Sequence, residues 1–92
     1  MRFEWDEAKR RINLKKHGFD FVDAPAIFEQ EHVIVLDERF DYEEPRFMAF
    51  GLLRGEVIVV VFVDRPNDAI RFISVRKASS LEAVNFINQI RN

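Results

Sequence analysis

Three strand-like runs separated by very short joins constrain the fold of this 92-residue chain more than any other feature. The runs are residues 46–53, 57–64 and 69–77, and each is dominated by aliphatic and aromatic side chains. Residues 54–56 and 65–68 join them and are rich in turn formers. Joins this short connect only antiparallel neighbours, so the sequence predicts a meander. The middle run is apolar on both faces, which indicates a central strand.

The side chains of the third run are expected to alternate between the two faces of the sheet. One face then holds Arg71, Ile73, Val75 and Lys77, and the other face holds Ile70, Phe72, Ser74 and Arg76. The run is therefore predicted to end with one cation on each face.

Residues 3–21 predict a short strand followed by a capped helix. Asp6 is placed to accept hydrogen bonds from the first turn, and Gly18 suits the left-handed conformation that ends a helix. The helix has few apolar positions, so we expect a narrow buried stripe formed by Ala8, Ile12 and Leu14. Its other side chains predict a nearly continuous cationic surface formed by Lys9, Arg10, Arg11, Lys15, Lys16 and His17.

Residues 19–30 have apolar side chains at helical spacing, with Asp20 placed as the cap. Pro25 is tolerated only in an opening turn, so this helix either starts near Asp23 or bends at Pro25. Residues 32–37 form an apolar run of strand length. The polar stretch that follows, residues 38–44, is strongly acidic and is predicted to be a loop.

Ser79 and Glu82 have the spacing of a capping box and predict a final helix over residues 80–90. Its expected core stripe consists of Leu81, Val84, Ile87 and Ile90, with Phe86 beside them. The elements together predict one small α+β domain covering residues 1–92. In it, two N-terminal helices and one C-terminal helix pack on an antiparallel sheet of three to four strands.

Charge is strongly segregated along the chain although the net charge is only −2. Residues 1–17 carry a net +3, residues 18–45 carry −8, and residues 46–92 carry +3. Two basic segments suit phosphate, and the acidic segment suits a basic partner. The N-terminus lacks the apolar core of a signal sequence, and the longest apolar run, residues 57–63, is too short to cross a bilayer. We therefore expect a cytoplasmic protein with no membrane partner.

Several motifs resemble the BrnT toxin family over essentially the whole chain. The N-terminal part of the resemblance is Phe3-x-Trp5-Asp6-x-x-Lys9, Asn13, Lys16-His17-Gly18 and Phe21-x-x-Ala24. The C-terminal part is Arg71-x-Ile73-Ser74-x-Arg76-Lys77-Ala78 followed by Glu82, with Glu44-x-Arg46, Gly51 and Gly55 in between. The chain departs from the family pattern at Phe86, where a tyrosine is common, and at Val63, where a threonine is usual.

The resemblance implies a RelE-like ribonuclease fold and a toxin that blocks translation by cutting RNA without a metal. It also implies neutralisation by a ribbon-helix-helix antitoxin similar to BrnA, which would carry the complex to operator DNA. No cofactor is expected. No metal site is predicted either, because His17 and His32 have no ligand spacing and the chain has no cysteine.

Metal-free RNA cleavage needs a base for the 2′-hydroxyl proton, cations for the phosphoryl oxygens, and an acid for the leaving 5′-oxygen. Arg71 and Arg76 are the first candidates for the cations, with Lys77 beside them, because the guanidinium fork can bridge two phosphate oxygens. His17 titrates near neutrality and suits either proton-transfer role. The competing interpretation is structural, with His17 binding a carbonyl at the helix end.

Glu44 and Arg46 lie two residues apart and are expected to point the same way, as a base and a phosphate clamp. They equally fit a surface salt bridge. Lys9, Lys16 and Arg65 are predicted to hold RNA phosphates rather than to catalyse.

The leading hypothesis is thus a metal-independent endoribonuclease toxin of a type II toxin–antitoxin pair that acts on messenger RNA. The alternative is a catalytically weak module that binds a DNA-binding antitoxin as a co-repressor. The nuclease hypothesis requires folding to bring His17 and Arg76 to one concave surface.

Overall fold

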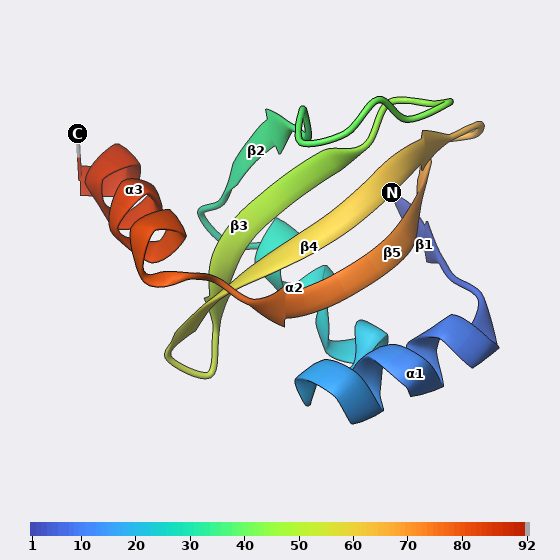
Figure 1. Ribbon diagram of the computed structural model, residues 1–92, viewed down its shortest axis with the longest axis horizontal. Helices are drawn as coiled ribbons and strands as arrows, with labels where there is room; N and C mark the ends of the chain where they lie inside the picture. Colours follow the sequence, from blue (N-terminus) through green and yellow to red (C-terminus); the bar gives the residue numbers. More distant parts are fainter. Residues whose placement is uncertain (92) are drawn as a thin grey trace.

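The computed structural model describes residues 1–91 and contains a five-stranded sheet in the order β1-β5-β4-β3-β2 (Figure 1). The strands are β1 (Arg2–Glu4), β2 (Val33–Leu36), β3 (Phe47–Leu53), β4 (Glu56–Arg65) and β5 (Ala69–Lys77). The helices are α1 (Glu7–His17), the 3₁₀ turn η1 (Phe21–Asp23), α2 (Pro25–Phe28) and α3 (Ser80–Arg91). The predicted meander is confirmed, because β3, β4 and β5 pair as antiparallel neighbours.

The sheet is nevertheless mixed, so the prediction of a purely antiparallel sheet of three to four strands was wrong. β1 pairs in parallel with the start of β5, with Arg2 opposite Ala69 and Glu4 opposite Arg71. The ring of Phe3 stacks on Phe72 with centroids 5.4 Å apart. A strand of three residues thus joins the edge of β5 because its central side chain enters the core.

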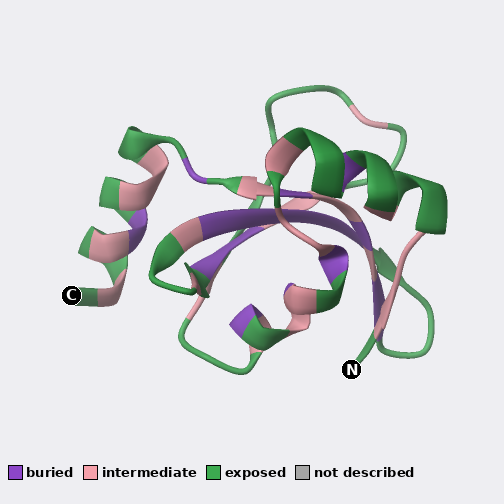
Figure 2. Cartoon of the chain, turned by 90° about the horizontal axis from the view of Figure 1, so that it is seen from below, coloured by how far each residue is buried: buried purple, intermediate pink, exposed green. Residues whose placement is uncertain are grey.

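The face of the sheet that packs under η1 and α2 carries the larger core. Phe21 and Ile27 come from these helices, and Ile58, Val60 and Phe72 come from the sheet; all are buried (Figure 2). We call this the first face. A Cβ on Gly51 would lie 2.8 Å from the Cβ of Ile27, so only glycine lets α2 approach β3 this closely.

The single helix considered for residues 19–30 is replaced by η1 and α2. Asp20 caps η1 as predicted, since its side chain accepts a hydrogen bond from the Val22 N–H at 3.1 Å. Pro25 lies at the first position of α2, where its missing N–H costs nothing. The proline therefore starts a second short helix instead of bending a longer one.

α3 covers part of the opposite face, which we call the second face. Phe86 is buried there against Phe50, Val59 and Val61. The predicted stripe of α3 was partly wrong, because Leu81 is 71% exposed and Val84 is 54% exposed, and Ala83 packs inward instead. A lipid bilayer could not be spanned by any helix formed within residues 1–91, since each lacks the necessary apolar length.

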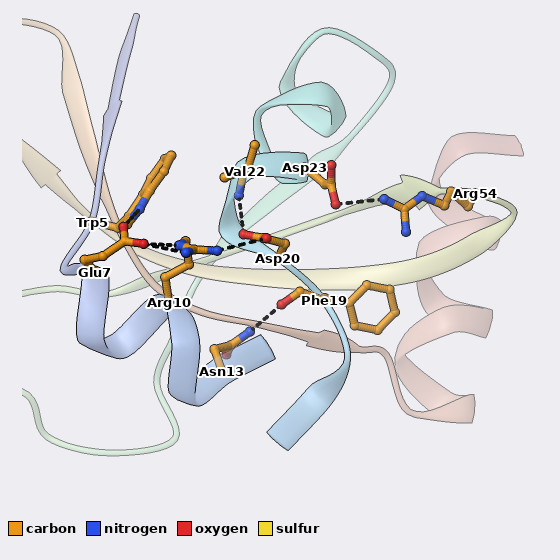
Figure 3. A network of polar contacts seen from close by, with 9 residues as sticks. All are labelled: Trp5, Glu7, Arg10, Asn13, Phe19, Asp20, Val22, Asp23 and Arg54. Atoms are coloured by element: carbon orange, nitrogen blue, oxygen red, sulfur yellow. Dashed lines mark hydrogen bonds and ion pairs between the residues drawn. The ribbon is translucent and has the colours of Figure 1, made fainter. Parts of the chain in front are cut away.

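α1 is attached to the domain by polar contacts, and its predicted apolar stripe was wrong. Ile12 is 65% exposed and Leu14 is 38% exposed, whereas Asn13 is the buried residue of the helix. Arg10 binds Glu7 within α1 and also binds Asp20 before η1, at 3.0 Å (Figure 3). The Arg10 guanidinium is thus ion-paired with two carboxylates, and Arg10 does not belong to the exposed cationic surface.

Candidate active site

The side chain of Asn13 fixes α1 beside the open edge of β5. β1 covers only the start of that edge, so the peptide groups of Val75 have no strand next to them. The Asn13 amide N–H donates to the Val75 carbonyl at 2.8 Å, and its oxygen accepts from the Val75 N–H at 3.0 Å. The amide also donates to the Phe19 carbonyl at 3.1 Å. One side chain thus replaces a neighbouring strand and sets the rotation of the helix.

This attachment creates a groove between α1 and the second face of β5. Figure 1 shows α1 running beside β5. The groove has a volume of about 190 Å³. Its α1 wall includes Lys9, Lys16 and His17, and its β5 wall consists of Ile73 and Ser74. Three of the residues predicted from the sequence to contact RNA therefore meet in one place.

A β-bulge in β5 brings Arg71 and Arg76 to the same face of the sheet. Val61 pairs with Ser74 and the next residue, Phe62, pairs with Phe72, so Ile73 is an extra residue. Paired residues of antiparallel strands share a face of the sheet. The extra residue therefore reverses the faces of the β5 side chains that follow it. Arg71 lies opposite Val63 and Arg76 opposite Val59, and both partners belong to the second face. The predicted placement of Arg71 and Arg76 on opposite faces was therefore wrong, whereas the strand does end with one cation on each face, Arg76 and Lys77.

Val75 and Lys77 are moved to the first face by the same shift. Val75 pairs with Val60, and Lys77 pairs with Ile58, in the core that η1 and α2 cover. The Lys77 ammonium lies 3.8 Å from Glu56, and its side chain is 69% exposed. Lys77 is therefore not brought to the groove with Arg76.

Arg76 lies at the end of β5 next to the last turn of α1. Its guanidinium donates to both carboxylate oxygens of Glu82, at 2.8 and 3.0 Å, and to the Lys77 carbonyl at 3.3 Å. These bonds orient the guanidinium and leave other N–H donors of its planar fork available. This contact with Arg76 also lowers the pKa of Glu82 to about 2.

Burial lowers the pKa of His17 below its ordinary value, and the charges of Lys16 and Arg76 lower it further. The lowered pKa favours the neutral form of the imidazole, which can accept a proton. Asn13, one helical turn before His17, is bonded to Val75, the residue before Arg76, so the last turn of α1 lies beside the end of β5 that carries Arg76.

Arg71 lies toward the other end, near the start of α1. The Lys9 backbone N–H lowers the pKa of the Asp6 carboxyl, and the charges of Arg71 and Lys9 add to this effect. Arg71 lies 3.7 Å from Glu4 on β1, and Arg65 lies 3.6 Å from the same carboxylate. Along a strand, five residues span roughly 16 Å, so Arg71 and Arg76 can contact different phosphates of one RNA strand.

Glu44 and Arg46 lie in the loop before β3, and each contacts another residue. Glu44 is 4.0 Å from Arg65, whereas the Arg46 guanidinium lies over the Tyr42 ring, 4.4 Å from its centroid. β3 begins at Phe47, one residue later than predicted. Register places Arg46 beside Val63, next to Arg71 on the second face. Arg46 thus joins the arginine cluster of Arg65 and Arg71, away from His17.

Residues 5–82 match the model of a protein family described as ribonuclease toxin, BrnT, of type II toxin-antitoxin system. The chain belongs to the BrnT toxin family. It is also similar to the crystal structure of the Brucella abortus ribonuclease toxin BrnT, with 35% sequence identity and a TM-score of 0.66. That match covers 87% of this chain and 99% of the Brucella chain. No curated protein sequence matches.

Membership of the BrnT family confirms the resemblance that the motifs indicated. The match to the Brucella structure also confirms the predicted small α+β domain. The family is described as ribonuclease toxins of type II toxin-antitoxin systems, and this description implies an RNA substrate and a cognate antitoxin. The relation to RelE stays a prediction. So do the roles of the individual site residues.

Two residues that shape this BrnT site were not recognised as such from the sequence. Asn13 was part of the motif, but its contact with β5 was missed; the signal was a poor helix former between Ile12 and Leu14 in mid-helix. Glu82 was part of the motif and of a predicted capping box, and the structure confirms the capping box, since the Ser79 N–H donates to Glu82 at 2.8 Å. The contact between Glu82 and Arg76 depends on where β5 ends, so the spacing of the two residues in the sequence does not predict it.

Proposed function

We propose that this BrnT-family chain is a metal-independent endoribonuclease that cleaves messenger RNA and so inhibits translation. The observation that carries the proposal is a groove lined by Lys9, Lys16 and His17. The hydrogen bonds between Asn13 and Val75 hold the last turn of α1 beside the end of β5 that carries Arg76. The imidazole can act as the base, and the guanidinium is a cation that Glu82 holds in a fixed orientation.

In this mechanism His17 takes the proton from a ribose 2′-hydroxyl, and the 2′-oxygen attacks the adjacent phosphorus. Arg76 stabilises the charge that develops on the phosphoryl oxygens, and Lys9 and Lys16 hold the flanking phosphates. The departing 5′-oxygen takes a proton from water and His17 returns its proton to solvent, which leaves a 2′,3′-cyclic phosphate and a 5′-hydroxyl end. Arg71, with Arg46 and Arg65 beside it, would bind the strand further along the second face.

Cleavage assays with Arg76→Gln test the proposal. Purified protein with RNA and EDTA is expected to produce 5′-hydroxyl fragments, and Arg76→Gln should cleave at least about 100-fold more slowly, as when one charge-stabilising donor is removed. Arg54→Gln is the matched control, because it also removes one positive charge and one ion pair. The Arg54 guanidinium lies 2.7 Å from the Asp23 carboxylate. The control should keep its rate within about twofold. Equal rates for wild type and Arg76→Gln would refute the assignment.

The alternative, a catalytically weak antitoxin-binding co-repressor, is favoured by one observation. Arg71 and Arg76 each have a carboxylate partner, Glu4 and Glu82 respectively, that an RNA phosphate must displace or share. The same assay separates the two functions. Wild-type protein that leaves RNA intact and does not arrest growth would leave the co-repressor function.

A further inference from the structure

β2 is the outermost strand of the sheet, and one of its edges has no neighbouring strand within residues 1–91 (Figure 1). The Asp37 N–H donates to the Arg46 carbonyl at 2.8 Å, one residue beyond the end of β2. Alternate residues of an antiparallel strand bond to the same neighbour, so Val33 and Val35 turn their peptide groups toward β3. Ile34 and Leu36 therefore present their N–H and C=O groups at the open edge.

The side chains of β2 do nothing to protect this edge. Soluble proteins block open edges with lysine, proline or a bulge, because unprotected edges pair with other chains. β2 reads Val-Ile-Val-Leu, and Ile34, Val35 and Leu36 are 46%, 37% and 48% exposed. A short aliphatic strand left open in this way is suited to receive another strand.

Hollows lie on both sides of β2. On the second face, Val33 and Val35 line a groove of about 170 Å³ against Phe86 of α3. On the first face, Ile34 and Phe47 line a hollow of about 240 Å³. The side chains of an added strand alternate between the two faces, so each hollow can take every second residue.

The charge around β2 selects the partner. Residues 29–44 contain seven acidic residues and one basic residue, Arg39. Arg39 is taken up by the buried Asp37, with contacts of 2.8 Å to each carboxylate oxygen, and Tyr42 donates to the same carboxylate at 3.0 Å. Glu44 lies 4.0 Å from Arg65. The remaining five carboxylates belong to the segments directly before and after β2: Glu29, Glu31, Glu38, Asp41 and Glu43. Pairing of β2 with a second copy of this chain would bring two such acidic segments together, which charge repulsion opposes.

We propose that the open edge of β2 binds the cognate antitoxin as a sixth strand, through an extended basic segment with alternating apolar side chains. The proposal rests on the proposed function only for the identity of the partner. The backbone groups of Ile34 and Leu36 supply the main-chain hydrogen bonds. The hollows on either side select the apolar side chains, and the acidic segment attracts the flanking basic residues.

Ile34→Pro tests the proposal with full-length toxin and its antitoxin. Proline removes the outward N–H of residue 34 and blocks the edge, but it leaves the bonds of Val33 and Val35 to β3 intact. Ile34→Val is the control, because it keeps both the N–H and a β-branched side chain. Antitoxin affinity, measured by calorimetry, should fall at least about 100-fold for Ile34→Pro and less than about threefold for Ile34→Val.

Two further measurements make the result decisive. Thermal unfolding and the rate of RNA cleavage should match wild type in both variants, because Ile34 lies outside the α1–β5 groove. In wild-type complex, hydrogen exchange at the amides of Ile34 and Leu36 should slow. Unchanged affinity of Ile34→Pro, unchanged exchange at these amides, or a toxin dimer paired through β2 would overturn the proposal. Absence of RNA cleavage by wild type would instead count against the proposed function alone.

Discussion

The buried side chain of Asn13 links α1 to β5 by three hydrogen bonds, so its loss should cost more than the loss of the larger apolar residue beside it. Asn13→Ala leaves the Val75 peptide without partners, and we expect the free energy of unfolding to fall by about 2 kcal/mol. Ile12→Ala removes a side chain that is 65% exposed and should cost less than about 0.5 kcal/mol. Urea denaturation of both variants measures the difference. A larger loss for Ile12→Ala would mean that α1 is held by apolar packing after all.

At the scale of elements, the contact between Glu82 and Arg76 fastens the start of α3 to the end of β5. The pKa of Glu82 is lowered from its ordinary value of 4.5 to about 2 in the folded protein, first by the hydrogen bonds from Arg76. A lowered folded-state pKa stabilises the protein above the unfolded pKa, and this contribution is lost as the pH falls from about 4.5 to about 2. Glu82→Gln should therefore lower the free energy of unfolding by about 2 kcal/mol at pH 7.

The difference in the free energy of unfolding between wild type and Glu82→Gln should shrink as the pH is lowered. Near the folded-state pKa of Glu82 it should be too small to measure. Denaturation of wild type and Glu82→Gln across this range gives the difference directly. Glu56→Gln is the control, because Glu56 lies 3.8 Å from the exposed Lys77 and its side chain is 47% exposed. That surface pair should contribute little at any pH. A stability difference for Glu82→Gln that does not change with pH would contradict the ion-pair origin.

Strand and helix bounds were predictable where local chemistry decides them. Asp6 and Gly18 cap α1 as expected, because the left-handed φ of 78° at Gly18 and the acceptor position at Asp6 are local requirements. The faces of β5 were not predictable. The bulge at Ile73 arises from its pairing with β4, and a single extra residue reverses every later side chain.

The candidate site was partly predictable for the same reason. The motifs indicated that Lys9, Lys16, His17 and Arg76 act together. The structure brings Lys9, Lys16 and His17 to one groove, and the bonds of Asn13 to Val75 hold α1 beside the end of β5 that carries Arg76. The sequence also grouped Lys77 with Arg76, but these neighbours lie on opposite faces of the sheet. The stripe of α1 was mispredicted because polar contacts of Asn13 and Arg10, which depend on distant partners, replace apolar burial.

For the molecule as a whole, the segregation of charge means that a net charge of −2 does not prevent RNA binding. The second face and the α1 groove present Lys9, Lys16, Arg71 and Arg76. The carboxylates of Glu29, Glu31 and Glu38 belong to the segments that flank β2, at the opposite edge of the sheet. Binding of single-stranded RNA should therefore weaken steeply with salt. Each phosphate contact contributes about −0.7 to the slope of log K against log salt, so four contacts predict a slope of about −3.

A 2′-O-methylated RNA oligonucleotide allows this slope to be measured without cleavage, since the attacking hydroxyl is blocked. Lys16→Gln should reduce the steepness by about 0.7, because it removes one phosphate contact from the groove. Lys77→Gln removes the same charge from the first face, where Lys77 pairs with Glu56, and should leave the slope unchanged. If Lys77→Gln changed the slope as much as Lys16→Gln, RNA would be binding around the end of β5 on both faces. The charge that attracts RNA would then be a property of the whole molecule and not of the groove.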